Sequence, residues 1–141
     1  MGRTDTGIAT ARRVVAIDPL NPLSHFSLSG ALFYARRDEE AVAAFGQVVS
    51  RLALANDRLG RHADAETALT CLKALMGDGA AYEYAAIYAQ WGDTGEALSW
   101  LETALRLRDP YLVTRKTDPR IDPLRKEPRF QAVMRELKFP G

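Results

Sequence analysis

The stretch Ala41–Gly60, AVAAFGQVVSRLALANDRLG, decides how two helical hairpins of this chain are joined. Asp38–Leu59 contains no proline and a single glycine, Gly46, and it is dominated by Ala, Val, Leu, Gln and Arg. The three acidic residues that begin at Asp38 suit the N-terminus of a helix. We therefore predict one continuous helix over residues 38–59, about 33 Å long at 1.5 Å per residue. The alternative is a break of the helix at Gly46. A glycine inside a helix lowers its stability by only about 1 kcal/mol, which a continuous helix tolerates.

Two segments of the chain share a pattern of small and large apolar residues. Ser50–Leu72 aligns with Tyr82–Leu105 when Gly60 is placed on Gly92, at an offset of 32 residues. Three further pairs keep this offset: Ala53 with Ala85, Ala65 with Ala97, and Leu69 with Leu101. In each segment a helix, a short loop at glycine and a second helix follow one another. One such hairpin cannot cover its apolar face alone, so the pattern predicts an all-α fold of stacked hairpins.

At these residues the sequence resembles the tetratricopeptide repeat (TPR), and the resemblance implies a superhelix of antiparallel helical hairpins. The best copy is Ala81–Pro110, with Gly92 in its loop and Ala97 at the close-contact site between helices. His25–Phe45 carries a further copy. Thr6–Pro22 resembles the closing helix of an earlier copy, left by truncation or by a natural start. The expected divisions of a single domain, 1–141, are a half repeat at 6–22, repeats at 23–49, 50–77 and 78–110, and a capping tail at 111–141.

The segment Asp109–Gly141 follows the last expected repeat and contains the pair Asp-Pro three times. These pairs, at 109–110, 118–119 and 122–123, are natural helix entrances, because proline is favoured at the first position of a helix. Arg129–Lys138 then places four apolar residues on one helical face: Phe130, Val133, Met134 and Leu137. The segment resembles the tails that close TPR arrays in many bacterial regulators. We expect it to cover the apolar face of the final hairpin.

The continuous helix has a consequence for the oligomeric state. In an ordinary array the second helix of one hairpin folds back to pack against the first helix of the next, and fusing the two removes that contact. The apolar residues that would then face water are Phe45, Val48, Val49, Leu52 and Leu54. Burying a Leu or Phe is worth about 1.5–3 kcal/mol, so exposing several of them is unfavourable. We therefore predict a homodimer, intertwined or swapped, in which a second chain runs antiparallel across a two-fold axis.

Composition and charge exclude several functional classes. The 141 residues suit one domain, with 47% hydrophobic and 26% charged residues, as in ordinary globular proteins. The net charge of +1 indicates neither a strongly basic nucleic-acid-binding protein nor an acidic one. No run approaches the roughly 18 apolar residues that span a bilayer, and the N-terminal MGRTDTG lacks an apolar signal core. With a single cysteine, Cys71, we expect a reducing, cytoplasmic setting and no membrane association.

The residue types needed for catalysis or metal binding are sparse. A histidine–carboxylate metal site would need His62, Asp64 and the distant His25, the second of only two histidines. Cys71 is interpreted as a packed side chain. Gly77–Gly79, GDG, is interpreted as a helix stop, because no strand precedes it and no Gly-Lys-Ser/Thr follows. We therefore expect no enzymatic activity, no metal and no cofactor.

The basic residues of the tail provide an alternative function, contact with nucleic acid. They are Arg115, Lys116, Arg120, Arg125, Lys126 and Arg129, with Tyr111 and Phe130 as aromatic neighbours. These charges are few for a nucleic-acid-binding surface. A solvated face of the last helix explains them more simply, so nucleic acid is not the expected partner.

The favoured function is a non-catalytic protein–protein interaction scaffold that binds a partner segment or assembles with itself. The resemblance implies a concave surface lined by the first helix of each hairpin. Its matching residues here include Tyr34, Leu54, Asp57, Arg58, Tyr82, Ala86 and Gln90, with Ser27 and Ala31 beside Tyr34. Apolar contact on such a surface favours a helical or extended segment of a protein or peptide. A purely structural role, in which the chain dimerises a larger bacterial regulator, is the second alternative.

Overall fold

The computed structural model describes residues 2–19, 21–112 and 118–137. These residues form α-helices, 3-10 turns and loops, and no strand occurs among them. The all-α expectation is therefore confirmed. The chain divides into two compact units, Met1–Met76 and Gly77–Gly141.

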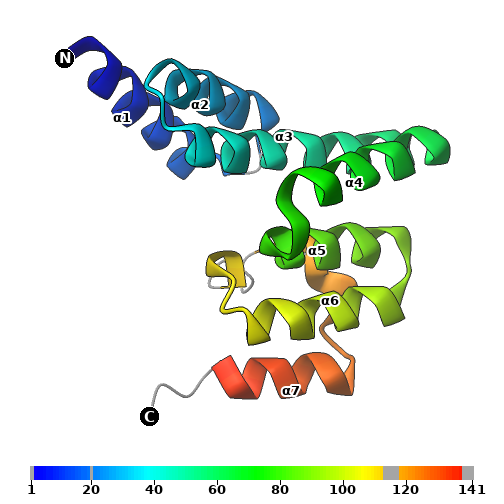
Figure 1. Cartoon of the computed structure of the whole chain (residues 1–141). Coiled ribbons are helices and arrows are strands. Elements are labelled where there is room, and N and C mark those ends of the chain that lie inside the picture. The colour runs from blue at the N-terminus through cyan, green and yellow to red at the C-terminus, as the bar shows by residue number, and fades with distance from the viewer. Residues whose placement is uncertain (1, 20, 113–117, 138–141) are drawn as a thin grey trace. The chain divides into compact units, whose positions relative to one another are not determined.

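The first unit contains four helices that follow one another as antiparallel hairpins: α1 Gly2–Ile17, α2 Pro22–Tyr34, α3 Asp38–Arg58 and α4 His62–Met76 (Figure 1). Each helix packs against the next along the chain. The side chain of Asn21 starts α2 by accepting from the Leu23 N–H at 3.0 Å, with Pro22 at the first helical position. A small apolar cluster of Ile8, Leu32, Ala41 and Ala44 joins the first three helices.

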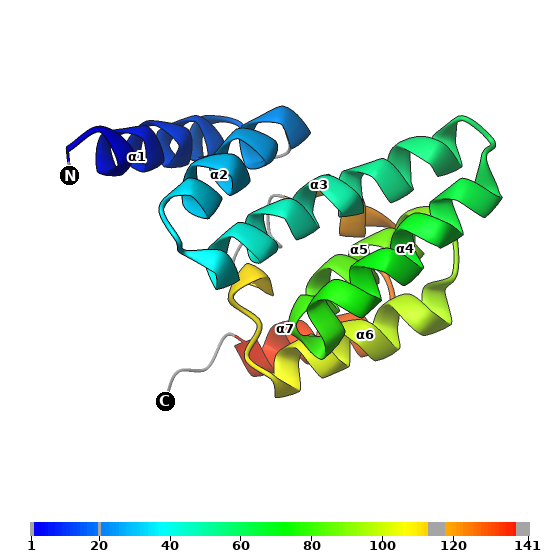
Figure 2. The ribbon, with the colours of Figure 1, turned by 45° about the horizontal axis from the view of Figure 1, so that its top comes forward.

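The predicted continuous helix is confirmed as α3, which runs unbroken for 21 residues (Figure 2). Two helices of the same unit, α2 and α4, pack against it. Gly46 lies inside the helix and is buried, so the alternative of a break there is wrong. A Cβ atom at Gly46 would lie 3.3 Å from Met76 Sδ and 3.4 Å from Leu72 Cδ1. The glycine thus allows α4 to approach α3 closely.

The hairpin loops after α2, α3 and α5 share one backbone design. A residue with positive φ ends each helix: Arg36 at 59°, Gly60 at 74° and Gly92 at 81°. The N–H of the following residue then reaches back to a carbonyl oxygen five residues earlier, as from Arg61 to Asn56 at 2.8 Å and from Asp93 to Tyr88 at 3.0 Å. The two glycines predicted as loops therefore occupy the conformation that glycine favours.

The second unit begins with η1 Gly77–Ala80 and the hairpin of α5 Ala81–Trp91 and α6 Thr94–Arg106. The Gly77–Gly79 segment separates two helices, as the sequence predicts. The tail then adds η3 Pro119–Leu124, which packs against α5, and α7 Pro128–Leu137, which packs against α6. The core of this unit includes Ala85, Ala97, Leu101, Ile121, Leu124, Phe130 and Val133.

The tail forms a cap on the hairpin, with one local difference from the prediction. Phe130 and Val133 of α7 are buried in the core, as their spacing predicts. Asp118 starts η3, and its Oδ1 accepts from the Arg120 N–H at 3.0 Å. Asp122-Pro123 is not a helix entrance, because Pro123 lies inside η3. A 3-10 helix of this length leaves few N–H groups that a proline could disrupt.

Candidate protein-interaction surface

The tail covers the residues of α5 that were predicted to line an open groove. Tyr82 and Ala86 are buried and Gln90 is half-buried, because η3 packs against α5. The Tyr82 hydroxyl donates to Asp118 Oδ2 at 3.0 Å, and Gln90 Nε2 donates to the Arg120 carbonyl oxygen at 2.8 Å. Tyr82 and Ala86 therefore do not line an open groove, contrary to the expected concave surface. The chain's own tail occupies that face of α5.

A buried ionic cluster fixes the tail on α5. Arg120 Nη1 donates to Glu83 Oε2 at 2.7 Å, and Arg120 Nη2 donates to Asp118 Oδ2 at 2.6 Å. The side chains of Arg120, Glu83 and Asp118 are at most 8% exposed. Burial alone would lower the pKa of Arg120, but the charges and hydrogen bonds of Glu83 and Asp118 outweigh it and raise the pKa. The guanidinium therefore stays protonated between its two carboxylates.

Two further polar groups tie the start of α5 to the tail. Asp109 accepts through Oδ2 from the Tyr82 N–H at 3.1 Å and through Oδ1 from the Tyr111 N–H at 2.9 Å. Burial raises the pKa of Asp109, although both hydrogen bonds act to lower it. Burial, together with the negative charge of Asp118, also raises the pKa of the Tyr82 hydroxyl. These contacts give the buried carboxylate of Asp109 and the buried hydroxyl of Tyr82 hydrogen-bond partners within the chain.

Sequence reasoning missed Arg120 as a buried residue and treated it as part of a basic surface. The signal that could have found it lies on α5, whose sequence AYEYAAIYA places Glu83 among apolar residues. A carboxylate on such a helix needs a cation if the helix is buried. The sequence does not identify the cation that pairs with Glu83, because Arg120 lies 37 residues further along the chain.

The predicted groove residues in the first unit do not form one site. Leu54 is buried, whereas Tyr34 and Arg58 are exposed. Asp57 Oδ1 lies 2.8 Å from His62 Nδ1, a contact across the loop between α3 and α4. These residues therefore carry separate local roles, and the expected concave peptide site is not assembled from them.

The two histidines make separate contacts, one with a backbone carbonyl oxygen and one with a carboxylate. His25 is buried, and its Nε2 lies 2.9 Å from the Pro19 carbonyl oxygen. His62 contacts Asp57, as described above. Within residues 2–19, 21–112 and 118–137, no group of three or more His, Cys, Asp or Glu side chains is arranged to hold a metal ion.

The predicted dimer residues of α3 divide into exposed and buried ones. Phe45 and Leu52 are exposed and Val48 is half-buried, but Val49 and Leu54 are only 6% and 5% exposed. The expectation that all five face water is therefore wrong for Val49 and Leu54. Their positions flank the face of α3 that carries Gly46, along which α4 packs.

The exposed large apolar side chains are concentrated in the first unit. Among the described residues, eleven of the thirteen such side chains belong to Met1–Met76. Seven of them lie on the α2–α3 hairpin, and five of these seven form what we call the hairpin strip. These are Phe26, Phe33, Val42, Phe45 and Leu52, which are 56, 63, 40, 40 and 53% exposed. Sequence reasoning assigned only Phe45 and Leu52 to this surface. The seven-residue spacing between Phe26 and Phe33 is the signal that could have added these two phenylalanines.

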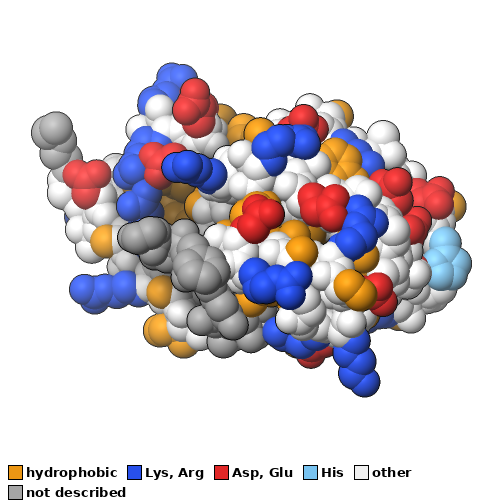
Figure 3. All heavy atoms as spheres, turned by 90° about the horizontal axis from the view of Figure 1, so that it is seen from below, with side chains coloured by type: hydrophobic (Ala, Val, Ile, Leu, Met, Phe, Trp, Pro, Cys, Tyr) orange, Lys and Arg blue, Asp and Glu red, His pale blue; other side chains and the backbone are white. Residues whose placement is uncertain are grey.

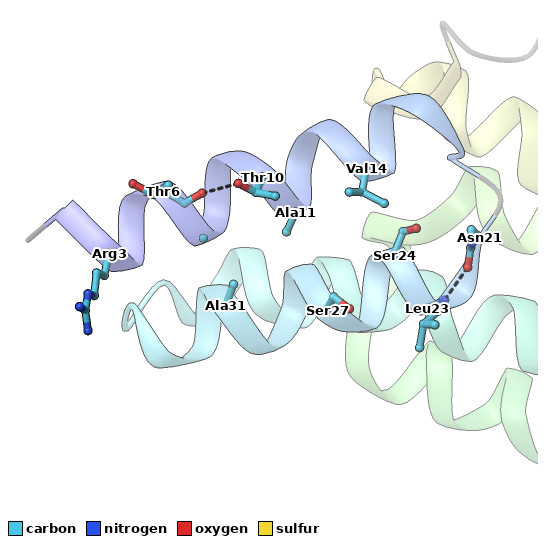
Figure 4. Close-up of a pocket in the computed structure, with 11 residues that line it drawn as sticks. Arg3, Thr6, Thr10, Ala11, Val14, Asn21, Leu23, Ser24, Ser27 and Ala31 are labelled. Carbon is cyan, nitrogen blue, oxygen red and sulfur yellow. Dashed lines mark hydrogen bonds between the residues drawn. The ribbon is translucent and has the colours of Figure 1, made fainter.

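A shallow hollow of about 700 Å³ lies between α1 and α2 in the same unit (Figure 4). Small side chains of both helices form its walls, among them Ala11, Ser27 and Ala31, and Arg3 lies at one end. Ser27 and Ala31 were expected to face outward beside Tyr34, and both line this hollow. The walls are held locally, since Thr10 Oγ1 donates to the Thr6 carbonyl oxygen at 2.9 Å.

The basic residues of the tail do not form a common surface. Arg120 is buried, Arg125 pairs with Asp122 at 2.5 Å, and Arg129 pairs with Glu102 at 2.8 Å. Arg115 and Lys116 lie outside the described residues. On the face of the molecule seen in Figure 3, basic and acidic side chains alternate. In the described part of the tail, three of the basic side chains, Arg120, Arg125 and Arg129, are therefore paired with carboxylates, and Lys126 is exposed.

The fold and these surfaces define an all-helical protein of consecutive hairpins, one of which is covered by its own tail. None of its described helices is long and apolar enough to cross a membrane. Comparison with known proteins finds no matching family model, no matching curated protein and no matching solved structure.

Proposed function

We propose that this chain is a non-catalytic, TPR-type protein–protein interaction scaffold that associates with a second copy of itself. The repeat assignment is supported by the buried alanines at the predicted close-contact sites. Ala53, Ala65, Ala85 and Ala97 are all at most 1% exposed. Small residues at these sites allow the two helices of a hairpin to approach closely, as the repeat requires.

The observation that carries the proposal is the uneven distribution of exposed apolar surface. The second unit covers α5 with η3 and α6 with α7, whereas the first unit leaves eleven large apolar side chains exposed among its described residues. Exposed apolar surface, where its side chains lie together, marks binding sites on soluble proteins. The first unit is therefore the binding surface of the scaffold.

The occupied face of α5 favours self-association over peptide capture by the second unit. A peptide would have to displace η3 and leave Glu83 without the Arg120 guanidinium, and an unpaired buried charge costs several kcal/mol. The same argument supports the second candidate, a structural module that dimerises a larger regulator. Both candidates require that two copies bind each other.

Self-association is tested by the dependence of thermal stability on protein concentration. If the folded chain forms a dimer, the midpoint of unfolding rises as the protein concentration is increased, because dissociation is favoured by dilution. A midpoint that stays constant over a hundredfold range of concentration would contradict the proposal.

A further inference from the structure

We infer that the hairpin strip is the two-fold interface through which a second copy of the chain binds, α2–α3 hairpin against α2–α3 hairpin. This inference rests on the proposed self-association and adds the face that carries it. It differs from the intertwined arrangement predicted from the sequence, because each hairpin stays within its own chain.

The hairpin strip lies on one side of the hairpin because three of its residues directly follow buried residues of the seam between α2 and α3. The seam contains Leu32, Ala41 and Ala44. An exposed apolar residue directly follows each seam residue: Phe33 follows Leu32, Val42 follows Ala41, and Phe45 follows Ala44. One residue turns a helix by about 100°. Since α2 and α3 are antiparallel, the same step turns all three side chains to the same side.

Two more aromatic and aliphatic residues extend the strip along each helix. Phe26 precedes Phe33 by seven residues, and Leu52 follows Phe45 by seven. Seven residues make about two helical turns, so each pair shares a face of its helix. The residues of the hairpin strip therefore share one face of α2 and one face of α3.

The area of the hairpin strip matches what a dimer needs. An aromatic side chain offers about 150–250 Å², so the three phenylalanines, together with the smaller Val42 and Leu52, present on the order of 400–500 Å² of exposed apolar surface. A standard interface buries about 800 Å² per partner, of which about 56–65% is non-polar. The strip thus supplies the apolar part of one such interface.

The chemistry of the hairpin strip favours a second copy as its occupant. A two-fold interface brings the same patch of both subunits together, so the patch must be complementary to itself. A patch with a net charge would repel its own copy, whereas the five residues of the strip are all uncharged and apolar. Gly30, midway between Phe26 and Phe33, has open space around the position of a Cβ atom, which permits close approach of another helix.

The test measures the dimer dissociation constant of the full chain and its variants by sedimentation equilibrium. Phe33→Asp and Phe45→Asp each place a charge in the strip of both subunits. Truncating a central interface residue commonly weakens binding more than tenfold, and each change occurs twice in the dimer. We therefore expect the dissociation constant to rise by about 100-fold or more. Ile17→Asp is the matched control, because Ile17 is 83% exposed in the same unit but lies outside the strip.

The outcomes separate the face from the self-association itself. Loss of the dimer in both strip variants, with the Ile17→Asp dimer intact, supports the inference. A wild-type dimer that tolerates both strip variants overturns the inference but leaves the proposed self-association standing. A wild-type chain that stays monomeric overturns both.

A measurement on the wild-type chain keeps the test independent of variant folding. A soluble paramagnetic probe broadens the NMR signals of exposed side chains. At concentrations where the dimer forms, the ring signals of Phe26, Phe33 and Phe45 should become protected, while the methyl signals of Ile17 stay exposed. Equal broadening of all four residues at every concentration would overturn the inference.

Discussion

Arg36 ends α2 in a backbone conformation that suits glycine. Its φ is 59°, and the equivalent positions after α3 and α5 are Gly60 and Gly92. A side chain in this left-handed region costs about 1–2 kcal/mol per residue. The loop after α2 is therefore less favourable than the two glycine loops, although its hydrogen bonds follow the same design.

Replacing Arg36 by glycine should stabilise the chain. The removed strain is offset in part by the greater freedom of glycine in the unfolded chain, so we expect a net gain of about 0.5–1 kcal/mol. The reciprocal control is Gly60→Arg, which should cost about 1–2 kcal/mol at the matching loop. Urea unfolding measures both changes as shifts of the midpoint. A destabilising Arg36→Gly would show that the arginine side chain has a role beyond the loop.

Tyr84 makes the stability of the second unit decrease at alkaline pH. Burial, with the charge of Asp78, raises the pKa of its hydroxyl from 10.0 to about 12. The hydroxyl donates to the Gly77 carbonyl oxygen at 2.5 Å. Between these two pKa values the unfolded chain loses the tyrosine proton and the folded chain keeps it. The stabilising contribution is thus complete below pH 10 and is lost as the pH rises toward 12.

The free energy of unfolding should therefore decline from about pH 10 upward, and the decline should be smaller in Tyr84→Phe. Urea titrations at a series of pH values measure both. The phenylalanine variant also loses the bond to Gly77, which lowers its stability at neutral pH but leaves the slope as the diagnostic quantity. Identical slopes in the two proteins would contradict the assigned pKa shift.

At the scale of elements, the local sequence predicted helices well and their packing faces poorly. The continuity of α3 follows from what is absent, since no proline and no turn residue interrupts Asp38–Arg58. By contrast, Val49 is buried because Gly46 lets α4 run back along α3, and that approach depends on Met76 and Leu72. Such a contact is tertiary and leaves no mark on the pattern of α3 alone.

The docking of η3 on α5 was beyond sequence reasoning for a similar reason. Arg120 lies in a segment rich in prolines and charges, which usually indicates solvent exposure. Its burial depends on Glu83, which belongs to the preceding hairpin. The spacing of residues on α5 gave no sign that the tail packs over the helix face predicted to line a groove.

Arg120→Ala should detach or loosen η3. The change leaves Glu83 and Asp118 buried without their cation, and breaking a buried ion pair in this way costs about 3–5 kcal/mol. The control is Arg125→Ala in the next turn, where the exposed pair with Asp122 is worth at most about 1 kcal/mol. Urea unfolding measures both losses. Equal small losses would show that the ionic cluster does not hold the tail.

At the scale of the whole molecule, the two units treat their apolar surface differently. In the second unit η3 and α7 pack against the α5–α6 hairpin. In the first unit the α2–α3 hairpin keeps Phe26, Phe33 and Phe45 exposed. Sequence reasoning expected uncovered apolar surface from the continuous helix, and on α3 this holds for Phe45 and Leu52 but not for Val49 and Leu54. It did not expect that α2 would contribute the most exposed aromatic rings of the strip.

The solution mass of the wild-type chain tests the central claim most directly. Light scattering or sedimentation across micromolar concentrations should give twice the chain mass of 15.6 kDa, because the hairpin strip of one copy covers that of another. A mass of 15.6 kDa at every concentration would contradict the account, since the exposed rings of α2 and α3 would then have no second copy to bind.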